Sequence, residues 1–281
     1  MFQSKGIDLM TSKVWFITGT SRGLGRVWAE TALARGDKVV ATARSVASLQ
    51  PLVATYGDAI LPVALDVTDR EAVFASIDAA VARFGRLDVV VSNAGYALFG
   101  TIEESSEPQA RAQFETNLFG TLWVIQATLP HLRAQGRGHI LVTSSVAGVI
   151  TFPTAGVYNA TKWAVEGLVE TLASEVGAFG IKVTLVEPGG YDTDWRAGSA
   201  VSAEPMPAYE ELRKKIKAMS ANRALGNPAA TGSAILAAVD AEEPPLRLFL
   251  GKAGLPAARQ AYAQRLSTWE AWSAVAEDAQ G

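Results

Sequence analysis

The feature that most constrains the fold of this chain is a glycine-rich turn that joins a strand-like run to a helix-like run near its start. Residues 14–18 form an apolar run, the turn at 18–25 reads TGTSRGLG, and a helical pattern follows as far as Arg35, where Gly36 ends it. Glycines allow a tight turn and a close approach of the backbone to a pyrophosphate, which the N-terminus of the next helix attracts. The turn lacks the Gly-Lys-Ser/Thr ending of a nucleotide-hydrolysing P-loop. The sequence therefore predicts a dinucleotide site here, and a purely structural strand–helix turn is the alternative.

The rest of the chain alternates between short β-rich runs and longer helical patterns. Further strands are expected at residues 38–43, 60–65, 87–91, 139–143, 182–186 and 246–250, and helices at 70–84, about 109–135 and 157–179. This alternation indicates βαβ units, and the continuous apolar runs indicate strands that are covered on both faces. We expect a single α/β domain over residues 13–255, built as a doubly wound, parallel, seven-stranded sheet of the Rossmann type.

Three further segments flank or interrupt that domain. Residues 1–12 are interpreted as an N-terminal tail, in which Met10 is a candidate for the natural start. Residues 189–226 are rich in Gly, Pro, Ala and Ser, with a short helical stretch at 209–219. A long irregular insertion of this kind is usually functional, so we expect a lid there. Residues 256–281 predict a C-terminal helix with one apolar side, whose Trp residues are expected to serve packing rather than chemistry. That side consists of Ala261, Leu266, Trp269 and Trp272.

The composition excludes several classes of function. The net charge is −3 and no polybasic run is present, so the sequence offers no electrostatic surface for nucleic acid or for an anionic membrane. The chain contains no cysteine, and its two histidines, His131 and His139, have no carboxylates at metal-ligand spacing, so no metal site is expected. No run approaches the ~18 apolar residues of a membrane span, and the first residues lack the apolar core of a secretory signal. We therefore expect a cytoplasmic protein.

Tyr158 and Lys162 lie four residues apart in the helix expected at 157–179, thirteen residues after Ser145. Residues at i and i+4 share one helix face. A nearby cation favours the tyrosinate and lowers the phenol pKa from its usual ~10, which suits acid–base catalysis at neutral pH. A Tyr–Lys pair of this spacing is also common on surface helices, so the accompanying motifs decide between the two interpretations.

The end of the second expected strand indicates which dinucleotide would bind. Dinucleotide sites often carry an acidic residue there, which accepts from a free ribose 2′-hydroxyl and repels a 2′-phosphate. This chain has Arg44 at that place and Arg22 inside the glycine turn, and guanidinium groups bind phosphate in a bidentate manner. The sequence favours NADP(H) over NAD(H). A solvated Arg44 in an enzyme that accepts both cofactors is the alternative.

Taken in order, these motifs resemble those of the short-chain dehydrogenases/reductases of the Tyr-x-x-x-Lys type, over about residues 13–250. The turn matches TGxxxGxG, the SNAG segment at 92–95 matches NNAG with Ser92 in place of the first Asn, and the PGGYDT segment at 188–193 resembles PGxxxT. The resemblance is greatest to members described as ketoreductases or hydroxysteroid-dehydrogenase-like proteins. It implies a cofactor site formed by Gly19, Ser21, Arg22, Gly23, Leu24, Gly25, Arg44, Asp66, Val67, Asn93, Ala94, Gly95, Tyr158, Lys162, Pro188, Gly189, Tyr191 and Thr193.

The resemblance also implies catalytic roles for Asn117, Ser145, Tyr158 and Lys162. Tyr158 would protonate a carbonyl oxygen or deprotonate an alcohol, and Lys162 would lower the Tyr158 pKa and hold the nicotinamide ribose. Ser145 would hydrogen-bond the substrate oxygen, a contact typically worth about 10²–10³ in rate. Asn117 would interrupt its helix to hold a water in the proton path. Ser144 is the competing serine, and its expected role is at the strand end.

The function expected from the resemblance is that of an NADP(H)-dependent oxidoreductase that interconverts a ketone or aldehyde and an alcohol, with a small-molecule carbonyl or alcohol substrate. A non-catalytic NADP(H)-binding sensor of the same fold, or an isomerase, epimerase or lyase, is the alternative. The resemblance further implies a homo-oligomer, dimer or tetramer, built on the helices at 109–135 and 157–179. The walls of the substrate pocket should be mostly apolar or aromatic. The candidates are Tyr96, Leu98, Phe152, Tyr191, Trp195 and Met206.

Overall fold

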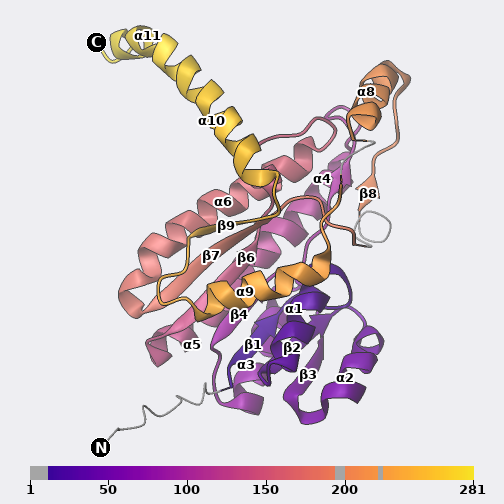
Figure 1. The fold of residues 1–281 in the computed structure, drawn as a ribbon, viewed down its shortest axis with the longest axis vertical. Helices are drawn as coiled ribbons and strands as arrows, with labels where there is room; N and C mark the ends of the chain where they lie inside the picture. Colours follow the sequence, from indigo (N-terminus) through magenta and orange to yellow (C-terminus); the bar gives the residue numbers. More distant parts are fainter. Residues whose placement is uncertain (1–11, 194–199, 221–223) are drawn as a thin grey trace, which may run out of the picture.

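The centre of the molecule is a seven-stranded sheet in which every strand is parallel to its neighbours (Figure 1). The computed structural model describes residues 12–193, 200–220 and 224–281. The strand order is β3-β2-β1-β4-β6-β7-β9, which confirms the doubly wound Rossmann-type sheet expected from the sequence. The strands are β1 (Val14–Ile17), β2 (Lys38–Ala43), β3 (Ile60–Ala64), β4 (Val89–Ser92), β6 (Gly138–Thr143), β7 (Ile181–Pro188) and β9 (Arg247–Leu250).

Helices cover both faces of this sheet. One buried cluster joins the strands to α3 (Arg70–Phe84), α5 (Gly120–Gln135) and α6 (Gly156–Val176). A second cluster, on the opposite face, joins them to α1 (Gly23–Ala34), α2 (Gln50–Tyr56) and α9 (Thr231–Asp240). Neighbouring strand residues alternate between the clusters, as Trp15 and Phe16 do, because successive side chains of a strand point to opposite faces. Burial on both faces is the reason that these strands are continuous apolar runs.

The long helix expected at 109–135 is interrupted. It consists of α4 (Glu107–Phe114), a π-helical segment (Glu115–Phe119) and α5. The Ser106 side chain caps the start of α4 and forms a capping box with Gln109. The π-helical segment contains Asn117, and insertions of this kind are frequent at functional sites.

The segment at 189–226, expected to be a lid, is tied to the loop that follows β5 (Leu98–Phe99). Its two-residue strand β8 (Val201–Ser202) pairs with β5, and its helix α8 (Glu210–Ser220) lies beyond. The Glu104 carboxylate accepts from the Met206 N–H at 2.7 Å and from the Arg213 guanidinium at 2.5 Å. Hydrogen bonds from the backbone of Thr101 and Met206 lower the pKa of Glu104 to about 2, so this tether stays ionised at physiological pH.

The C-terminal helix predicted from the sequence is present, but most of its apolar side is exposed. Two helices, α10 (Gly254–Ala271) and α11 (Ser273–Asp278), project from the body of the molecule at one end (Figure 1). The start of α10 is buried against the body at Gly254 and Ala258. Further along, the Arg265 guanidinium lies 4.7 Å from the Trp163 ring centroid and donates to the Val149 carbonyl. Beyond that point Trp269 and Trp272 are 62% and 64% exposed.

Candidate active site

The glycine-rich turn connects β1 to α1 and is fastened to the neighbouring strands. The buried Thr20 donates from both N–H and Oγ1 to the Thr42 carbonyl of β2, at 2.9 and 3.1 Å. Gly19 has a φ of 70°, and a Cβ there would lie 3.0 Å from the Ala94 Cα. A Cβ on Gly25 would lie 2.4 Å from the Asn93 Nδ2. Glycine is therefore required at both positions, by backbone conformation at the first and by close packing at both.

Asn93, expected among the cofactor-binding residues, uses its side chain to hold the turn. Its Nδ2 donates to the carbonyls of Thr18 and Gly19 at 3.0 and 3.2 Å, and its Oδ1 accepts from Thr143. The Thr18 Oγ1 in turn accepts from the N–H groups of Asn93 and Ala94. The SNAG segment thus positions the turn.

The surroundings of the turn fit a dinucleotide. α1 begins at Gly23 without a side-chain cap and without an acidic residue in its first turn, so its first N–H groups suit an anion. Ser21, Arg22 and Arg44 are exposed beside this helix start. Asp66 is exposed, and its Oδ1 accepts from the N–H and Oγ1 of Thr68. The described part of the chain contains no cluster of three or more His, Asp or Glu side chains able to hold a metal ion.

Asn117 is 1% exposed and is held rigidly in the π-helical segment. Its Oδ1 accepts from the Tyr96 N–H at 3.1 Å, and its Nδ2 donates to the Tyr96 carbonyl and to Thr161 Oγ1. A Cβ on Gly95 would lie 3.0 Å from Asn117 Oδ1 and 3.8 Å from Lys162 Nζ, which places these groups around one point. The interruption of the helix is as expected, and the side-chain amide acts as a brace.

The structure brings Ser145, Tyr158 and Lys162 together at the carboxyl end of β6. A hydrogen bond joins the Ser145 and Tyr158 hydroxyls. The Lys162 Nζ lies 5.9 Å from the centre of the Tyr158 ring and donates to the Thr143 carbonyl at 2.7 Å. Residues one turn apart on α6 therefore converge on the serine that follows the strand.

Burial controls the ionisation of this group of side chains. Burial raises the pKa of Tyr158 to about 12, and the hydrogen bond with Ser145 acts in the lowering direction. The same burial lowers the pKa of Lys162 to about 8, against the Glu166 carboxylate, which raises it. The net shift of the Tyr158 pKa is therefore upward, because desolvation of the phenol is the largest effect, and the lowering by Lys162 expected from the sequence stays a prediction.

The two adjacent serines have different surroundings. Ser145 Oγ accepts from the Ala147 N–H and donates to the Pro188 carbonyl at 3.4 Å, on the side of Tyr158. Ser144 is 2% exposed and points towards Glu166, whose pKa its hydroxyl lowers. This geometry places Ser145, and not Ser144, beside the tyrosine.

The segment from Pro188 to Thr193 leads from β7 into the expected lid. The Gly189 N–H donates to the Leu250 carbonyl, and the Thr193 N–H donates to the Tyr191 carbonyl. The Tyr191 ring packs on Gly226, where a Cβ would lie 2.7 Å from the ring. Tyr191 therefore joins the two ends of that segment, and its phenol pKa is raised by burial.

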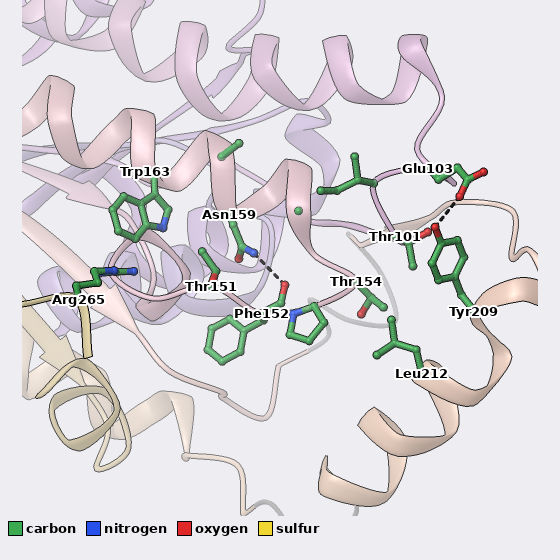
Figure 2. Close-up of a pocket in the computed structure, with 14 residues that line it drawn as sticks. Thr101, Glu103, Thr151, Phe152, Thr154, Asn159, Trp163, Tyr209, Leu212 and Arg265 are labelled. Atoms are coloured by element: carbon green, nitrogen blue, oxygen red, sulfur yellow. Dashed lines mark hydrogen bonds between the residues drawn. The ribbon is translucent and has the colours of Figure 1, made fainter. Parts of the chain in front are cut away.

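A cavity of about 970 Å³ lies between α6, α8 and the loop at 151–154 (Figure 2), and its described lining does not include Ser145, Tyr158 or Lys162. Its described lining includes Phe152, Trp163 and Leu212, with the Tyr209 hydroxyl bonded to Glu103 at one end and Arg265 at the other. Of the six expected substrate walls, Phe152 is the one found in this lining. Leu98 is buried in β5, Met206 is tied to Glu104, and Trp195 lies outside the described residues. Tyr96 is hydrogen-bonded to Asn117, and the Tyr191 ring packs on Gly226.

Sequence reasoning missed the residues that support the site. The Thr143 carbonyl accepts a hydrogen bond from the Lys162 ammonium, and Thr161 Oγ1 accepts one from the Asn117 amide. The Gln113 amide donates to the Tyr96 carbonyl. Thr161 sits next to Lys162 in the sequence, but nothing in the sequence gives its contact with Asn117.

Comparisons with known proteins show which family the chain resembles. The short chain dehydrogenase family profile matches residues 13–203. The chain is similar to the oxidoreductase BOA17 of Botryotinia fuckeliana, with 44% identity over 250 residues, 85% of this chain and 89% of that protein. It also resembles the crystal structure of a short-chain dehydrogenase from Streptomyces avermitilis, with 39% identity and a TM-score of 0.89 over 95% of this chain and 98% of that one.

Two further solved structures contain a nicotinamide dinucleotide. A short-chain dehydrogenase/reductase from Burkholderia phymatum in complex with NAD has 27% identity and a TM-score of 0.78, over 88% of this chain and 92% of that one. An alcohol dehydrogenase from Thermococcus sibiricus complexed with 5-hydroxy-NADP has 30% identity and a TM-score of 0.70, over 85% and 96%. None of the helices in the described ranges is long and apolar enough to span a membrane.

Proposed function

This chain belongs to the short-chain dehydrogenase/reductase family of oxidoreductases, and we propose that it uses NADP(H) to interconvert a ketone or aldehyde and an alcohol. The observation that carries the proposal is the convergence of Ser145, Tyr158 and Lys162 beside the glycine-rich turn. A phenol, a hydroxyl and an ammonium at one point can hold a carbonyl oxygen and move a proton to it. The bound nicotinamide would supply or accept the hydride.

Tyr158 acts as the acid in reduction. Its pKa of about 12 keeps the phenol protonated at neutral pH, so a proton is available as charge develops on the substrate oxygen. Ser145 donates to the same oxygen, after exchanging its contact with the Pro188 carbonyl for one with the substrate. Lys162, fixed by the Thr143 carbonyl, keeps a positive charge near the tyrosinate that proton transfer leaves behind.

The cofactor would lie along the carboxyl edge of the sheet. The N–H groups at the start of α1 would hold the pyrophosphate, Asp66 and Val67 would border the adenine, and Lys162 would bind the nicotinamide ribose. Asn117 would hold a water in the proton path. Its side-chain amide is bonded to Tyr96 and Thr161, and its main-chain carbonyl accepts from Thr121 Oγ1 at 2.9 Å and has a second lone pair for that water.

The preference for NADP(H) is proposed from the exposed Arg22 and Arg44, whose guanidinium groups would bind a ribose phosphate. Arg44→Ala should raise KM for NADPH about tenfold or more and leave KM for NADH nearly unchanged. Arg83→Ala, at the far end of α3 from the turn, is the control. An unchanged ratio of the two KM values would contradict the assignment.

The reaction itself is tested by NADPH oxidation with a panel of ketones and aldehydes. Tyr158→Phe should lower kcat at least about 10²-fold while NADPH binding is retained, because the ring remains and only the proton is lost. Tight NADPH binding without turnover across the panel would favour a non-catalytic sensor instead.

We also propose a homo-oligomer. Three large aromatic side chains on or beside the expected interface helices are partly exposed: Phe119 (36%), Trp163 (37%) and Phe179 (45%). Burial of such residues in an interface would remove apolar area from water. Light scattering of the full chain distinguishes monomer, dimer and tetramer.

A further inference from the structure

A carboxylate lies inside an apolar strand on the active-site side of the sheet. Glu187 is in β7 and is 0% exposed. The side chains of Leu185 and Glu187 point to the same face of the sheet, because strand residues alternate, and Leu185 packs in the cluster that contains α6. A lone buried carboxylate is costly unless it is paired, hydrogen-bonded or neutral.

The group that faces Glu187 is a second buried carboxyl. Glu166 is 6% exposed and lies one turn after Lys162 on α6. Among the described residues, both oxygens of Glu187 and the Oε1 of Glu166 accept no hydrogen bond. Two ionised carboxylates offer only acceptors, so they cannot satisfy each other.

Arg247 on β9 is the cation closest to this pair. It pairs in register with Leu185, which puts its side chain on the same face as Glu187. Its Nε lies 3.0 Å from Glu166 Oε2 and 3.6 Å from Glu187 Oε1. Its Nη2 is bound at 2.9 Å by Glu170, which is exposed. The Arg247 guanidinium therefore lies within ion-pair distance of three carboxyl groups.

A single proton on one of the two carboxyls would lower the buried negative charge and also supply a hydrogen-bond donor between them. If one carboxyl keeps its proton, its O–H can donate to the other, and the buried charge falls to one. Burial raises the pKa of Glu187 to about 8, and the neighbouring Glu166 charge adds to this, whereas Arg247 opposes it. The pKa of Glu166 is raised by burial as well, against Ser144, Arg247 and Lys162.

We propose that Glu187 and Glu166 share one proton and that this pair, clamped by Arg247, is a positioning element for Lys162. The groups around it are Lys162 and Glu170 from α6, Ser144 from the turn after β6, Glu187 from β7 and Arg247 from β9. Because Glu166 raises the pKa of Lys162 while burial lowers it to about 8, the charge on the pair determines how much of Lys162 is an ammonium at neutral pH. The catalytic consequence rests on the proposed function, but the shared proton does not.

The first test uses the unliganded full chain and no substrate. Infrared spectra at pH 7 should contain the carbonyl stretch of a protonated carboxylic acid, and Glu187→Gln should remove it. Glu170→Gln, which removes an exposed partner of the same arginine, is the matched control and should keep the band. Absence of the band in the native protein would overturn the shared proton.

The second test follows Lys162 by NMR of ¹³C-labelled lysine, with its signal assigned from its loss in Lys162→Met. Glu166→Gln should lower the midpoint of the Lys162 titration by about one pH unit or more, because a neighbouring negative charge is removed. Glu187→Gln should lower it less, and Glu170→Gln should leave it in place. If the Glu166→Gln protein does not fold, the test relies on the shift of the Lys162 titration midpoint in Glu187→Gln. An unchanged midpoint in every variant that folds would overturn the positioning role.

Activity provides the last test and separates this inference from the proposed function. The alkaline limb of the pH profile of kcat should move to lower pH in Glu187→Gln, with KM for the carbonyl substrate nearly unchanged. If no carbonyl compound is turned over but the infrared band and the NMR shift are present, the proposed function fails and the shared proton stands. If turnover is present and the alkaline limb is the same in both proteins, the positioning role fails alone.

Discussion

Replacing Gly25 by alanine tests the close packing of the glycine-rich turn. A Cβ there would lie 2.4 Å from the Asn93 Nδ2 and 2.5 Å from the Gly19 carbonyl oxygen. The carbonyl belongs to the backbone of the turn and moves only with it, so the Asn93 amide has to give way. It would then lose its hydrogen bonds to the carbonyls of Thr18 and Gly19, at 3.0 and 3.2 Å.

The magnitude follows from three contributions to the free energy of unfolding. Each lost hydrogen bond costs about 1 kcal/mol, and overpacking of a closely packed site costs about 1–3 kcal/mol. Alanine is a better helix former than glycine by about 1 kcal/mol, which acts in the opposite direction. We expect Gly25→Ala to destabilise the protein by about 3 kcal/mol and to weaken NADPH binding, because the first turn of α1 is displaced.

Urea unfolding and NADPH titration measure the two effects. Gly167 in α6 is the matched control, since a Cβ there would meet nothing within 4 Å. Gly167→Ala should therefore stabilise the protein by up to about 1 kcal/mol and leave NADPH binding unchanged. A Gly25→Ala protein as stable as the native one, with unchanged affinity, would refute the argument that this glycine is required by contact.

Three other predictions concern ionisation, catalysis and the C-terminal helices. Burial raises the pKa of Glu187 from 4.5 to about 8, so its contribution to stability is fully present below about pH 4.5 and is lost as the pH rises to 8. The stability of Glu187→Gln relative to the native protein should accordingly increase from pH 5 to pH 8 in urea unfolding, and parallel curves would contradict this. Ser145→Ala should lower kcat by about 10²–10³, while Ser144→Ala should retain most of the turnover; the reverse order in steady-state assays would exchange the two assignments. Trp269→Ala and Trp272→Ala should each change the free energy of unfolding by less than about 0.5 kcal/mol in dilute protein, because both side chains are largely exposed; a loss of several kcal/mol in urea unfolding would show that these side chains are buried in solution.

The parts of the fold that rest on local patterns could be predicted from the sequence. The parallel sheet follows from runs that are apolar at every position, and the turn at Gly19 follows from glycine spacing after a strand. The two-residue strands β5 and β8 were missed because runs that short have no periodicity to detect. The helix α9 was missed although it is buried against α1.

The ionisation of the site residues was harder to predict than their identity. Helix spacing places Lys162 beside Tyr158, but it gives no measure of how far the phenol is removed from water, and that burial decides the direction of its pKa. In the same way, an apolar stripe on the C-terminal helix does not say whether a surface of the same chain covers it. The acidic residue in the strand sequence LVEP was the visible signal for the Glu187 pair, but its partners come from two other elements.

The position of β9 after all other strands of the sheet in the sequence has a consequence for synthesis. Domains generally fold from the N-terminal side while the ribosome extends the chain, so β1 to β4 can assemble early. Until β9 emerges, β7 is an open edge whose unpaired N–H and C=O groups can recruit another chain. Arg247 arrives with β9, so the two buried carboxyls also lack their cation until then. Nascent chains that stall before Arg247 should therefore aggregate or be degraded, and completion of the sheet coincides with completion of the charge cluster behind Lys162.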